Sequence, residues 1–414
     1  MRVLFATYPA KTHFHAMVPL AWALRGAGHE VTVAAQPGFA AEINQAGLTA
    51  VPVGADRSLG RMLEANPALL EELRAEGDAP AAEPTWADVK DEYSESVTWW
   101  YKMENVPMVH SLVTFARQWR PDLVVWEPTT SAGAIAAKAC GAAHARLMYT
   151  PDSFGLTRAN YLRLRPPNPA PGESDTLAEW LASYADKYGA SFSEDMVTGQ
   201  FTIDHFPDSL RLDAGLTYVR TRYVPYGGAA VVPDWLTTPP RRPRIAITLG
   251  MDAFAAELRE ILGSLAELDV EVVATVPDDR RAALGPVPGN VRLVSYVPLL
   301  ALVPTCSVVI HHAGAGTLAT TSLYGVPQLV LRLSLEGDFD EPELVGGLTG
   351  QGAGVAVRPG AGIGTAVREN VVRLLEEPRF RERAAALRAE MLALPSPGES
   401  VGELERLAAE HRGR

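Results

Sequence analysis

Short apolar runs alternate along the chain with longer segments in which apolar residues recur every three or four positions. The run at residues 3–6 predicts a buried strand, and the apolar positions at 17–24 predict a helix packed on it. Glycines at 26 and 28 end this helix, and a second apolar run follows at 31–34. A strand, a helix and a strand at this spacing form a βαβ unit, which implies a parallel sheet with right-handed crossovers.

Later apolar runs extend this sheet and then begin a second one. Runs at 123–126 and 144–149 predict two further strands, with an Ala-rich helix between them. The pattern restarts near residue 244, with a helix expected at 254–268 and strands expected at 244–249, 270–276, 291–296, 307–311 and 328–331. We therefore expect an α/β protein of two doubly wound, Rossmann-like domains facing a cleft.

Proline and charge patterns place the expected domain boundaries. The stretch "VVPDWLTTPPRRPR" is rich in proline and arginine, which is typical of a linker. We expect an N-terminal domain at 1–230, a linker at 231–243, a C-terminal domain at 244–384 and a charged helical tail at 385–414.

Residues 58–120 fit the strand pattern poorly and predict a helical insertion. This segment contains Trp99, Trp100 and Tyr101, followed by Met103, which is more apolar surface than one helix face buries. Two interpretations stay open: the insertion packs on its own sheet, or it presents a partly exposed surface to a partner protein.

Composition limits the classes of partner. The 414 residues carry a net charge of −12, with 47% hydrophobic and 21% charged residues. This acidic balance makes nucleic acid and anionic membranes unexpected partners. Cys140 and Cys306 lie in apolar surroundings and are expected to be reduced and buried. No signal peptide or membrane span is recognisable, so a cytoplasmic location is expected.

The stretch "IHHAGAGT" at 310–317 ends an expected strand and begins an expected helix. Glycines here allow a close approach to a ligand, and a helix N-terminus attracts anions such as a pyrophosphate. Adjacent strand residues point to opposite faces, so His311 and His312 are not expected to hold one metal ion. We expect one histidine to face the phosphate and the other to face the core.

Two other interpretations of motifs in the second half of the chain are not favoured. Gly314, Gly316 and Ala319 match the spacing of a dinucleotide-binding fingerprint, and Glu336 follows at the distance of a ribose-binding acid. That motif, however, belongs on the first strand of a domain rather than on a late one. The acidic pattern "DFD" at 338–340 resembles a cation-binding motif, but short acidic patterns are common in loops. No metal or cofactor is expected.

The segment "PAKTHFHAMVP" directly follows the first strand and therefore lies at the carboxyl edge of its sheet, where α/β proteins place their sites. His13 and His15 are both candidate bases, because an imidazole accepts a proton near neutral pH. Glu127 follows another strand of the same domain and is the candidate carboxylate that fixes the tautomer of the base.

Taken together, these residues resemble the two-domain GT-B glycosyltransferases, and among them the bacterial enzymes that attach deoxysugars to macrolide and anthracycline polyketides. The resemblance covers nearly the whole chain in the family's order. The segments that carry it include "THFHAMVPLAWALRGAGHEVTVAAQP", "FARQWRPDLVVWEPTTSAGAIAAKACGAAHARL", "RLDAGLTYVRTRYVPYGGAAVVPDWL" and "HHAGAGTLATTSLYGVPQLVL".

The resemblance implies inverting transfer of a deoxysugar from a nucleotide donor, expected to be dTDP-linked, to a hydroxyl of a hydrophobic polyketide-type aglycone. His13 matches the general base of that family. Glu127 matches the carboxylate partner of the base, which is Asp in many relatives.

The resemblance also implies a donor site in the second domain. His312 matches the pyrophosphate contact, together with the backbone of Gly314, Ala315, Gly316 and Thr317. Tyr296 and Val297 match the region near the nucleotide base, and Thr248 and Gly250 match a phosphate-side loop. Asp340 matches a sugar contact, although the loop that contains it departs in length from the family pattern and lacks its glutamine.

Many relatives of this type need a cytochrome-like auxiliary protein, which the resemblance places near residues 95–110. Two other functions stay open. A sugar-nucleotide epimerase has the same fold and pyrophosphate site but needs no acceptor pocket. A catalytically silent homologue would act as a binding partner of another enzyme, although an intact His13 favours catalysis.

Overall fold

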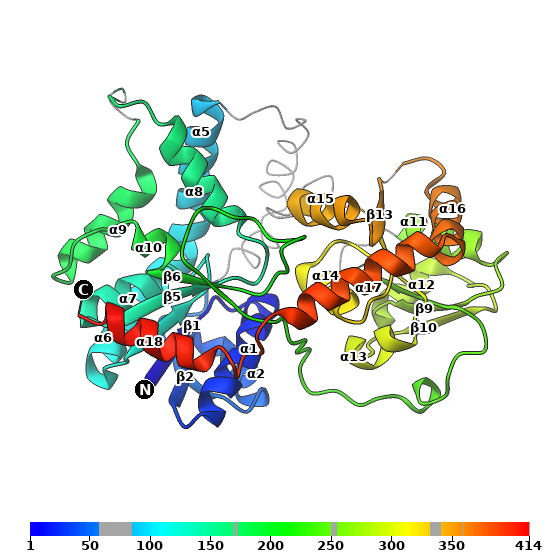
Figure 1. The fold of residues 1–414 in the computed structure, drawn as a ribbon, viewed down its shortest axis with the longest axis horizontal. Helices are drawn as coiled ribbons and strands as arrows, with labels where there is room; N and C mark the ends of the chain where they lie inside the picture. Colours follow the sequence, from blue (N-terminus) through cyan, green and yellow to red (C-terminus); the bar gives the residue numbers. More distant parts are fainter. Residues whose placement is uncertain are drawn as a thin grey trace. The chain divides into compact units, whose positions relative to one another are not determined.

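The computed structural model describes residues 1–57, 85–168, 170, 173–249, 255–331, 341–358 and 360–413. They form two compact units, each built around its own parallel sheet (Figure 1). The first unit comprises Met1–His205, Leu212–Thr221 and Pro395–Arg414, and the second comprises Phe206–Arg211 and Arg222–Leu394. The expectation of two Rossmann-like α/β domains is confirmed.

The first unit contains a seven-stranded sheet of order β3-β2-β1-β4-β5-β6-β7, in which every pair is parallel. Its strands are β1 (Arg2–Ala6), β2 (Glu30–Ala35), β3 (Thr49–Pro52), β4 (Leu123–Trp126), β5 (Ala143–Leu147), β6 (Phe201–Asp204) and β7 (Tyr218–Arg220). The four strands predicted in this half are β1, β2, β4 and β5, and their apolar side chains are buried. The other three were not predicted, because they are short and contain polar residues.

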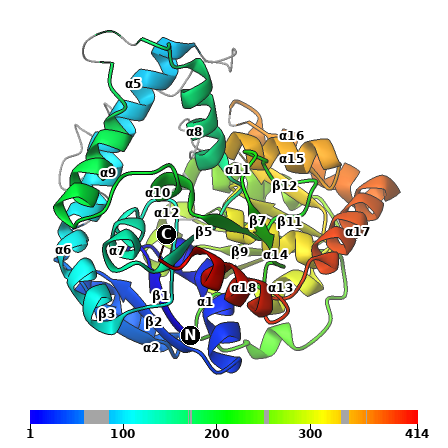
Figure 2. The same cartoon turned by 60° about the vertical axis from the view of Figure 1, so that its left-hand side comes forward.

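Helices cover both faces of this sheet (Figure 2). The helices of this unit among the described residues are α1 (Lys11–Gly26), the 3-10 turn η1 (Pro37–Phe39), α2 (Ala40–Gln45), α5 (Trp86–Ser96), the π-helix η2 (Val97–Tyr101), α6 (Lys102–Trp119), α7 (Ala132–Cys140), α8 (Ser153–Leu164), α9 (Thr176–Lys187), α10 (Asp195–Thr198) and α18 (Val401–His411). Residues 85–120 contain no strand, as predicted for the described part of the insertion. Val97, Met108 and Leu112 of this segment join the same core as Leu4 and Val124 of the sheet.

The second unit contains a six-stranded parallel sheet of order β10-β9-β8-β11-β12-β13. Its strands are β8 (Arg244–Thr248), β9 (Glu271–Thr275), β10 (Val291–Val294), β11 (Val308–His311), β12 (Gln328–Leu331) and β13 (Gly354–Val357). Its helices are η3 (Asp234–Leu236), α11 (Ala255–Leu265), α12 (Asp278–Leu284), α13 (Leu299–Leu302), η4 (Val303–Thr305), α14 (Ala315–Leu323), α15 (Glu341–Gln351), α16 (Ile363–Glu376) and α17 (Pro378–Ala393).

The compact units divide the chain differently from the boundaries drawn from the sequence. Residues 231–243, expected as a linker, belong to the second unit, where Leu236 is buried in a core cluster with Ala246 and Val309. Trp235 packs beside that cluster and carries the guanidinium groups of Arg244 and Arg292 over its ring. Leu236 and Trp235 therefore attach this proline-rich stretch to the second unit.

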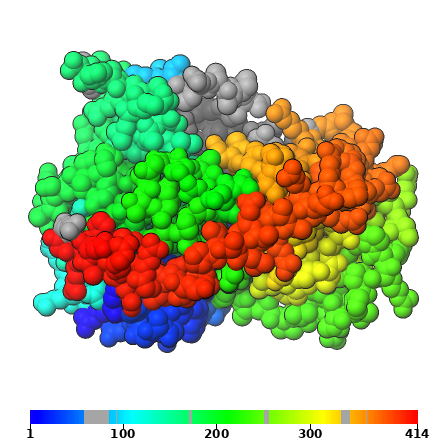
Figure 3. Space-filling model, viewed as in Figure 1, coloured from blue at the N-terminus to red at the C-terminus, as the bar shows by residue number. Residues whose placement is uncertain are grey.

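The expected tail at 385–414 is also split. Helix α17 lies in the second unit, whereas the residues from Pro395 onward, with α18, belong to the first. Helix α18 buries Leu404 and Leu407, and its Glu405 pairs with His29 at 3.0 Å. In Figure 3 the red atoms of this final segment form part of the surface beside the blue N-terminal residues. Within the described parts of the chain, no helix combines the length and the apolar character needed to span a bilayer.

Candidate active site

The first part of the site is a histidine–glutamate pair at the carboxyl edge of the first sheet. His13 lies in the first turn of α1, which begins shortly after β1 ends, and Glu127 directly follows β4, the neighbour of β1. His13 Nδ1 lies 3.3 Å from Glu127 Oε2, and 15% of the histidine side chain is exposed whereas Glu127 is fully buried. With Nδ1 directed at the carboxylate, Nε2 is the nitrogen left to accept a proton.

The structure distinguishes between the two candidate bases. His15 Nε2 lies 3.1 Å from Glu42 Oε1, and Glu42 also pairs with Lys11 at 2.9 Å. Burial lowers the pKa of His15, and the hydrogen bond to Glu42 offsets only part of this effect. His15 thus belongs to a separate ion-pair cluster on α1 and α2. His13 alone of the two pairs with Glu127.

Several donors converge on Glu127. The backbone N–H of Thr129 donates to Oε2 at 2.8 Å, and the N–H of Tyr8 donates to Oε1 at 3.2 Å. The hydroxyl groups of Thr129 and Thr130 also donate to this carboxylate. Burial by itself would raise the pKa of Glu127, but His13 and these donors hold it below its usual value. Glu127 is therefore an ionised carboxylate at neutral pH, suited to orienting His13 and stabilising its protonated form.

Tyr149 is a site residue that the sequence pattern does not reveal. It follows β5 and stacks on the imidazole of His13, with ring centroids 3.8 Å apart and planes inclined by 17°. Tyr8 approaches the same ring at a tilt, with a centroid distance of 6.1 Å. Tyr8 and Tyr149 both follow parallel strands of the sheet. This position after a strand is the sequence feature that could have pointed to them. The imidazole is thus fixed by a carboxylate at its edge and by a phenol ring on its face.

The two adjacent histidines of the second unit lie in different surroundings. His311 is fully buried, and its Nε2 lies 2.8 Å from Oε1 of Gln328 on β12. The backbone N–H of Ala313 donates to its Nδ1 at 3.2 Å. Burial lowers the pKa of His311 to about 4, so the ring is neutral at physiological pH. His312 is partly exposed, and its Nδ1 lies 3.4 Å from the carbonyl oxygen of Thr248 on β8.

Helix α14 begins directly beside His312. Gly314 is the N-cap, and no side chain of the described residues caps this end. The N–H of Thr317 donates to the carbonyl of Gly314 at 3.0 Å, so the N–H groups of Ala315 and Gly316 are the ones left for a ligand. A Cβ at position 314 would lie 3.0 Å from Nε2 of His312, and one at position 316 would lie 3.5 Å from the hydroxyl of Tyr223. Gly314 thus leaves room for His312 beside the helix end, whereas a Cβ at position 316 would make only an ordinary van der Waals contact. An anion fits these donors because the helix N-terminus carries partial positive charge.

The other residues predicted to bind the nucleotide-sugar donor differ from one another in burial and in their contacts. Tyr296 is 58% exposed, and its hydroxyl donates to the carbonyl of Gly227 at 3.1 Å. Val297 packs in the core with Leu236 and Val309, so any nucleotide contact at this position would come from its backbone. Thr248 ends β8 beside His312. Gly250 and Asp340, like Glu336 and Asp338, lie outside the described residues.

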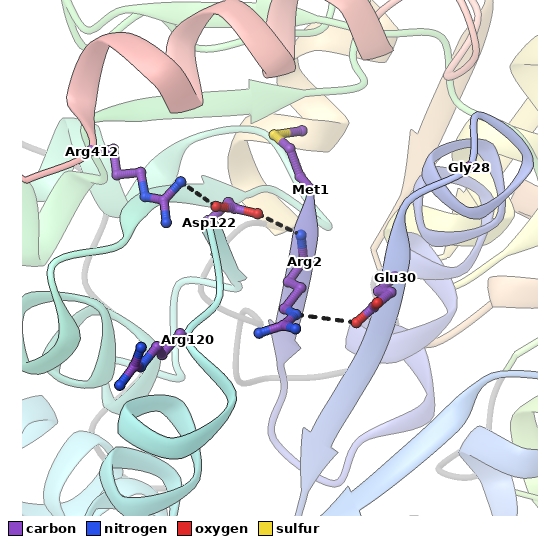
Figure 4. A pocket seen from close by; sticks show the side chains of 7 residues that line it. All are labelled: Met1, Arg2, Gly28, Glu30, Arg120, Asp122 and Arg412. Atoms are coloured by element: carbon purple, nitrogen blue, oxygen red, sulfur yellow. Dashed lines mark hydrogen bonds and ion pairs between the residues drawn. The ribbon is translucent and has the colours of Figure 1, made fainter.

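A separate pocket lies at the opposite, amino-terminal edge of the first sheet (Figure 4). It is lined by Met1, Arg2, Gly28, Glu30, Arg120, Asp122 and Arg412. Its charges are largely paired with one another: Arg412 bonds Asp122 at 2.5 Å, and Arg2 bonds Glu30 at 3.3 Å. The ion pair between Arg412 and Asp122 attaches the C-terminal segment to the sheet. The pocket is not part of the His13 site. Among the described residues, no group of three or more His, Cys, Asp or Glu side chains is arranged to hold a metal ion.

Solved glycosyltransferases share this architecture. The glycosyltransferase VinC in complex with dTDP is 37% identical, with a TM-score of 0.88 and coverage of 99% of this chain and 100% of that chain. The spinosyn forosaminyltransferase SpnP is 38% identical, with a TM-score of 0.81 and 99% coverage of both chains. The two Rossmann-like domains therefore define a GT-B glycosyltransferase fold.

The particular family follows from the sequence. Residues 22–250 match the N-terminal domain of erythromycin biosynthesis protein CIII-like proteins, and residues 259–407 match their C-terminal domain. The chain belongs to this family of glycosyltransferases. The 10-deoxymethynolide desosaminyltransferase of Streptomyces venezuelae is 44% identical over 100% of this chain and 98% of its own length. The aklavinone 7-beta-L-rhodosaminyltransferase of Streptomyces galilaeus is also 44% identical, over 100% of this chain and 97% of its own.

Proposed function

We propose that the protein is an inverting glycosyltransferase that moves a deoxysugar from a dTDP donor to a hydroxyl group of a polyketide-type aglycone. The transferases for desosamine and rhodosamine named above support the sugar and aglycone classes. The dTDP complex of VinC supports the nucleotide. Within the chain, the pairing of His13 with Glu127 carries the proposal, because it supplies an oriented base at the edge of the sheet where catalytic residues gather.

The chemistry is a single displacement. Nε2 of His13 takes the proton of the acceptor hydroxyl while that oxygen forms a bond to the anomeric carbon of the sugar. The bond between the anomeric carbon and the diphosphate oxygen breaks, and the diphosphate leaves with its electron pair. One displacement inverts the configuration at that carbon. Glu127 stabilises the imidazolium that forms, as the carboxylate does in other base–carboxylate pairs.

The donor is assigned to the second unit. The uncapped end of α14 and the partly exposed His312 supply donors for the leaving diphosphate, whose charge grows as the glycosidic bond breaks. Thr248, Tyr296 and Asp340 are proposed to contact the remaining parts of the nucleotide sugar. Because these donors are backbone N–H groups and an imidazole, we propose that no metal ion or other cofactor is needed.

Two experiments test this proposal. In the first, thermal unfolding is followed with dTDP and with UDP at equal concentration, and dTDP is expected to raise the melting temperature more. In the second, transfer from a dTDP-deoxysugar to a macrolide or anthracycline aglycone is followed with and without a chelator, and equal rates are expected. Stereochemistry at the anomeric carbon of the product is read by NMR. Donor conversion that needs no acceptor would instead indicate an epimerase, and binding without turnover would indicate a silent homologue.

We also propose an auxiliary protein surface on the π-helix η2. Trp99 is 45% exposed and Trp100 is 42% exposed, and Val106 on the next helix is 48% exposed. Large aromatic residues that stay half-exposed are typical of interface anchors. The auxiliary protein would be of the cytochrome-like type that assists relatives of this class.

A further inference from the structure

The loop between β5 and α8 carries Tyr149, whose ring stacks on His13. The loop comprises residues 148–152, all of which are buried except the partly exposed Tyr149. Where the loop begins, the backbone N–H of Met148 donates to the carbonyl of Ile203 on β6 at 2.9 Å. Where it ends, Asp152 is the N-cap of α8 and is 1% exposed. The loop is thus held at both ends, with Tyr149 between them.

Asp152 connects three elements of the first unit. Its Oδ1 accepts the backbone N–H of Gly155, in the first turn of α8, at 2.7 Å. Its Oδ2 accepts the hydroxyl of Tyr218 on β7 at 2.9 Å and an N–H of the Arg146 guanidinium group on β5. A Cβ at position 155 would lie 2.6 Å from Oδ2, so only glycine lets the carboxylate pack this closely against the helix. Both carboxylate oxygens therefore have donors, and these come from β5, β7 and α8.

Arg146 makes Asp152 difficult to displace. Arg146 is 1% exposed, and its guanidinium group also donates to the hydroxyl of Thr202 on β6 at 3.3 Å. Without Asp152 this buried cation would lack a counter-charge, which is strongly destabilising. Burial, and then the charge of Asp152, raise the pKa of Tyr218, so its hydroxyl keeps the proton that it donates to Asp152. The carboxylate is therefore fixed between the sheet and α8, three residues after Tyr149.

The ring of Tyr149 has an aromatic neighbour on each side. Phe154, in the first turn of α8, packs edge-on against it with ring centroids 6.2 Å apart and planes inclined by 65°. His13 lies on the other side, at 3.8 Å and 17°. Glu127 holds only the Nδ1 edge of the imidazole, and a single hydrogen bond tolerates a range of angles. A ring in contact with the face of the imidazole opposes the tilt that this bond allows.

We propose that Tyr149 is a positioning residue for His13, and that the cluster of Arg146, Asp152 and Tyr218 holds Tyr149 in place by fixing its loop. The proposal rests on the function assigned to His13 above. In this scheme the ring of Tyr149 keeps Nε2 of His13 directed at the acceptor hydroxyl and does not contact the diphosphate. Loss of the ring therefore lowers kcat and leaves the affinity for dTDP unchanged.

Substitutions at Tyr149 test the stacking contact. Tyr149→Leu removes the ring and should lower kcat roughly 3–10-fold, the range expected for an aromatic pair, without changing the Kd of dTDP. Tyr149→Phe keeps the ring and should stay within about twofold of the unsubstituted protein. Tyr184→Leu, the same change at a partly buried tyrosine of α9, is the matched control and should retain its rate. Equal rates in Tyr149→Leu and Tyr184→Leu, or an equal loss in Tyr149→Phe and Tyr149→Leu, would overturn the proposal.

Tyr218→Phe tests the cluster that holds the loop. It removes one donor to Asp152 and keeps the ion pair with Arg146, whereas Asp152→Asn would leave a buried guanidinium group without its carboxylate and endanger folding. We expect Tyr218→Phe to lower kcat less than Tyr149→Leu does. In the Tyr149→Leu background it should cause no further loss, because the ring through which it acts is gone. Additive losses, or no loss in either background, would overturn the role of the cluster.

A measurement without turnover separates this inference from the proposed function. The ring current of the stacked tyrosine shifts the NMR signal of the His13 Cε1–H upfield, and the signal is assigned by its loss in His13→Gln. At one pH and without substrates, Tyr149→Leu should move this signal downfield, whereas Tyr149→Phe and Tyr184→Leu should leave it in place. An unmoved signal in Tyr149→Leu would overturn the inference even if sugar transfer were found. A moved signal without any sugar transfer would support the stacking and contradict only the proposed function.

Discussion

His13 Nδ1 lies 3.3 Å from Glu127 Oε2, and the carboxylate is fully buried behind the partly exposed imidazole. The two residues come from the carboxyl ends of neighbouring parallel strands, so their proximity follows from the order β1-β4 in the sheet. The donors that bind Glu127 hold this carboxylate in place, and it directs Nδ1 of His13 toward itself. The imidazole of His13 is therefore held in one orientation, as its proposed role as general base requires.

The first prediction concerns His13. His13→Gln should lower kcat by roughly 10²–10⁴-fold, because the acceptor hydroxyl loses its general base. Affinity for dTDP should stay unchanged, since the donor residues belong to the second unit. His15→Gln is the control and should retain most of the activity, because His15 pairs with Glu42 instead. If the two variants were equally active in single-turnover transfer, His13 would not be the base.

The second prediction concerns His312. His312→Ala should weaken binding of dTDP by about 1.5–3 kcal/mol, the usual value of a hydrogen bond to a charged group. Isothermal titration calorimetry measures this loss directly. His15→Ala, which removes a partly exposed histidine from the first unit, should leave the affinity unchanged. Unaltered affinity in His312→Ala would show that the diphosphate is bound elsewhere.

The accuracy of the sequence predictions differs with the kind of interaction involved. Strand ends are visible in the apolar pattern, which is why the sequence alone indicates His13, Glu127 and His312. It does not indicate that Tyr149 stacks on His13 or that Glu104 is buried, because both depend on packing between separate elements. In the sequence, Glu104 is one of three charged residues of α6, with Lys102 and Arg117. Nothing in that pattern shows that its side chain is buried.

The dependence on packing between separate elements also explains the strands that were not predicted and the differences in domain boundaries. Strand β6 reads "FTID" and β7 reads "YVR", and both are too short and too polar to be separated from loops. Their positions are set by pairing with β5 and with each other. The return of the chain to the first unit after Leu394 depends on buried leucines of α18, whose helical pattern does not show which sheet they cover.

The third prediction concerns His311 and acid stability. Burial lowers the pKa of His311 to about 4, against 6.5 for the ordinary side chain. As pH falls, the side chain of His311 is protonated in the unfolded chain before it is protonated in the folded chain. The contribution of neutral His311 to stability is therefore complete above pH 6.5 and is lost as pH falls toward 4. His311→Gln should therefore show a weaker loss of stability between pH 7 and 5 in urea unfolding. His411→Gln, at the C-terminal end of α18, should keep the slope of the unsubstituted protein. Equal slopes for both variants would mean that His311 is not the group responsible.

The last prediction concerns the exposed tryptophans of η2. If Trp99 and Trp100 anchor an auxiliary protein, replacing either by Ala should weaken its binding by about 2 kcal/mol or more. The isolated chain should lose only about 1 kcal/mol, because each ring is already close to half-exposed and a fully buried ring would cost about 3–5 kcal/mol. Binding is measured by calorimetry with a cytochrome-like auxiliary protein, and stability by thermal unfolding without it. Leu162→Ala, at a 43% exposed leucine on α8, is the control and should leave the affinity unchanged.

A large loss of stability together with unaltered auxiliary binding would assign both rings to the fold. Turnover that does not rise when the auxiliary protein is added would exclude an activating role for this surface.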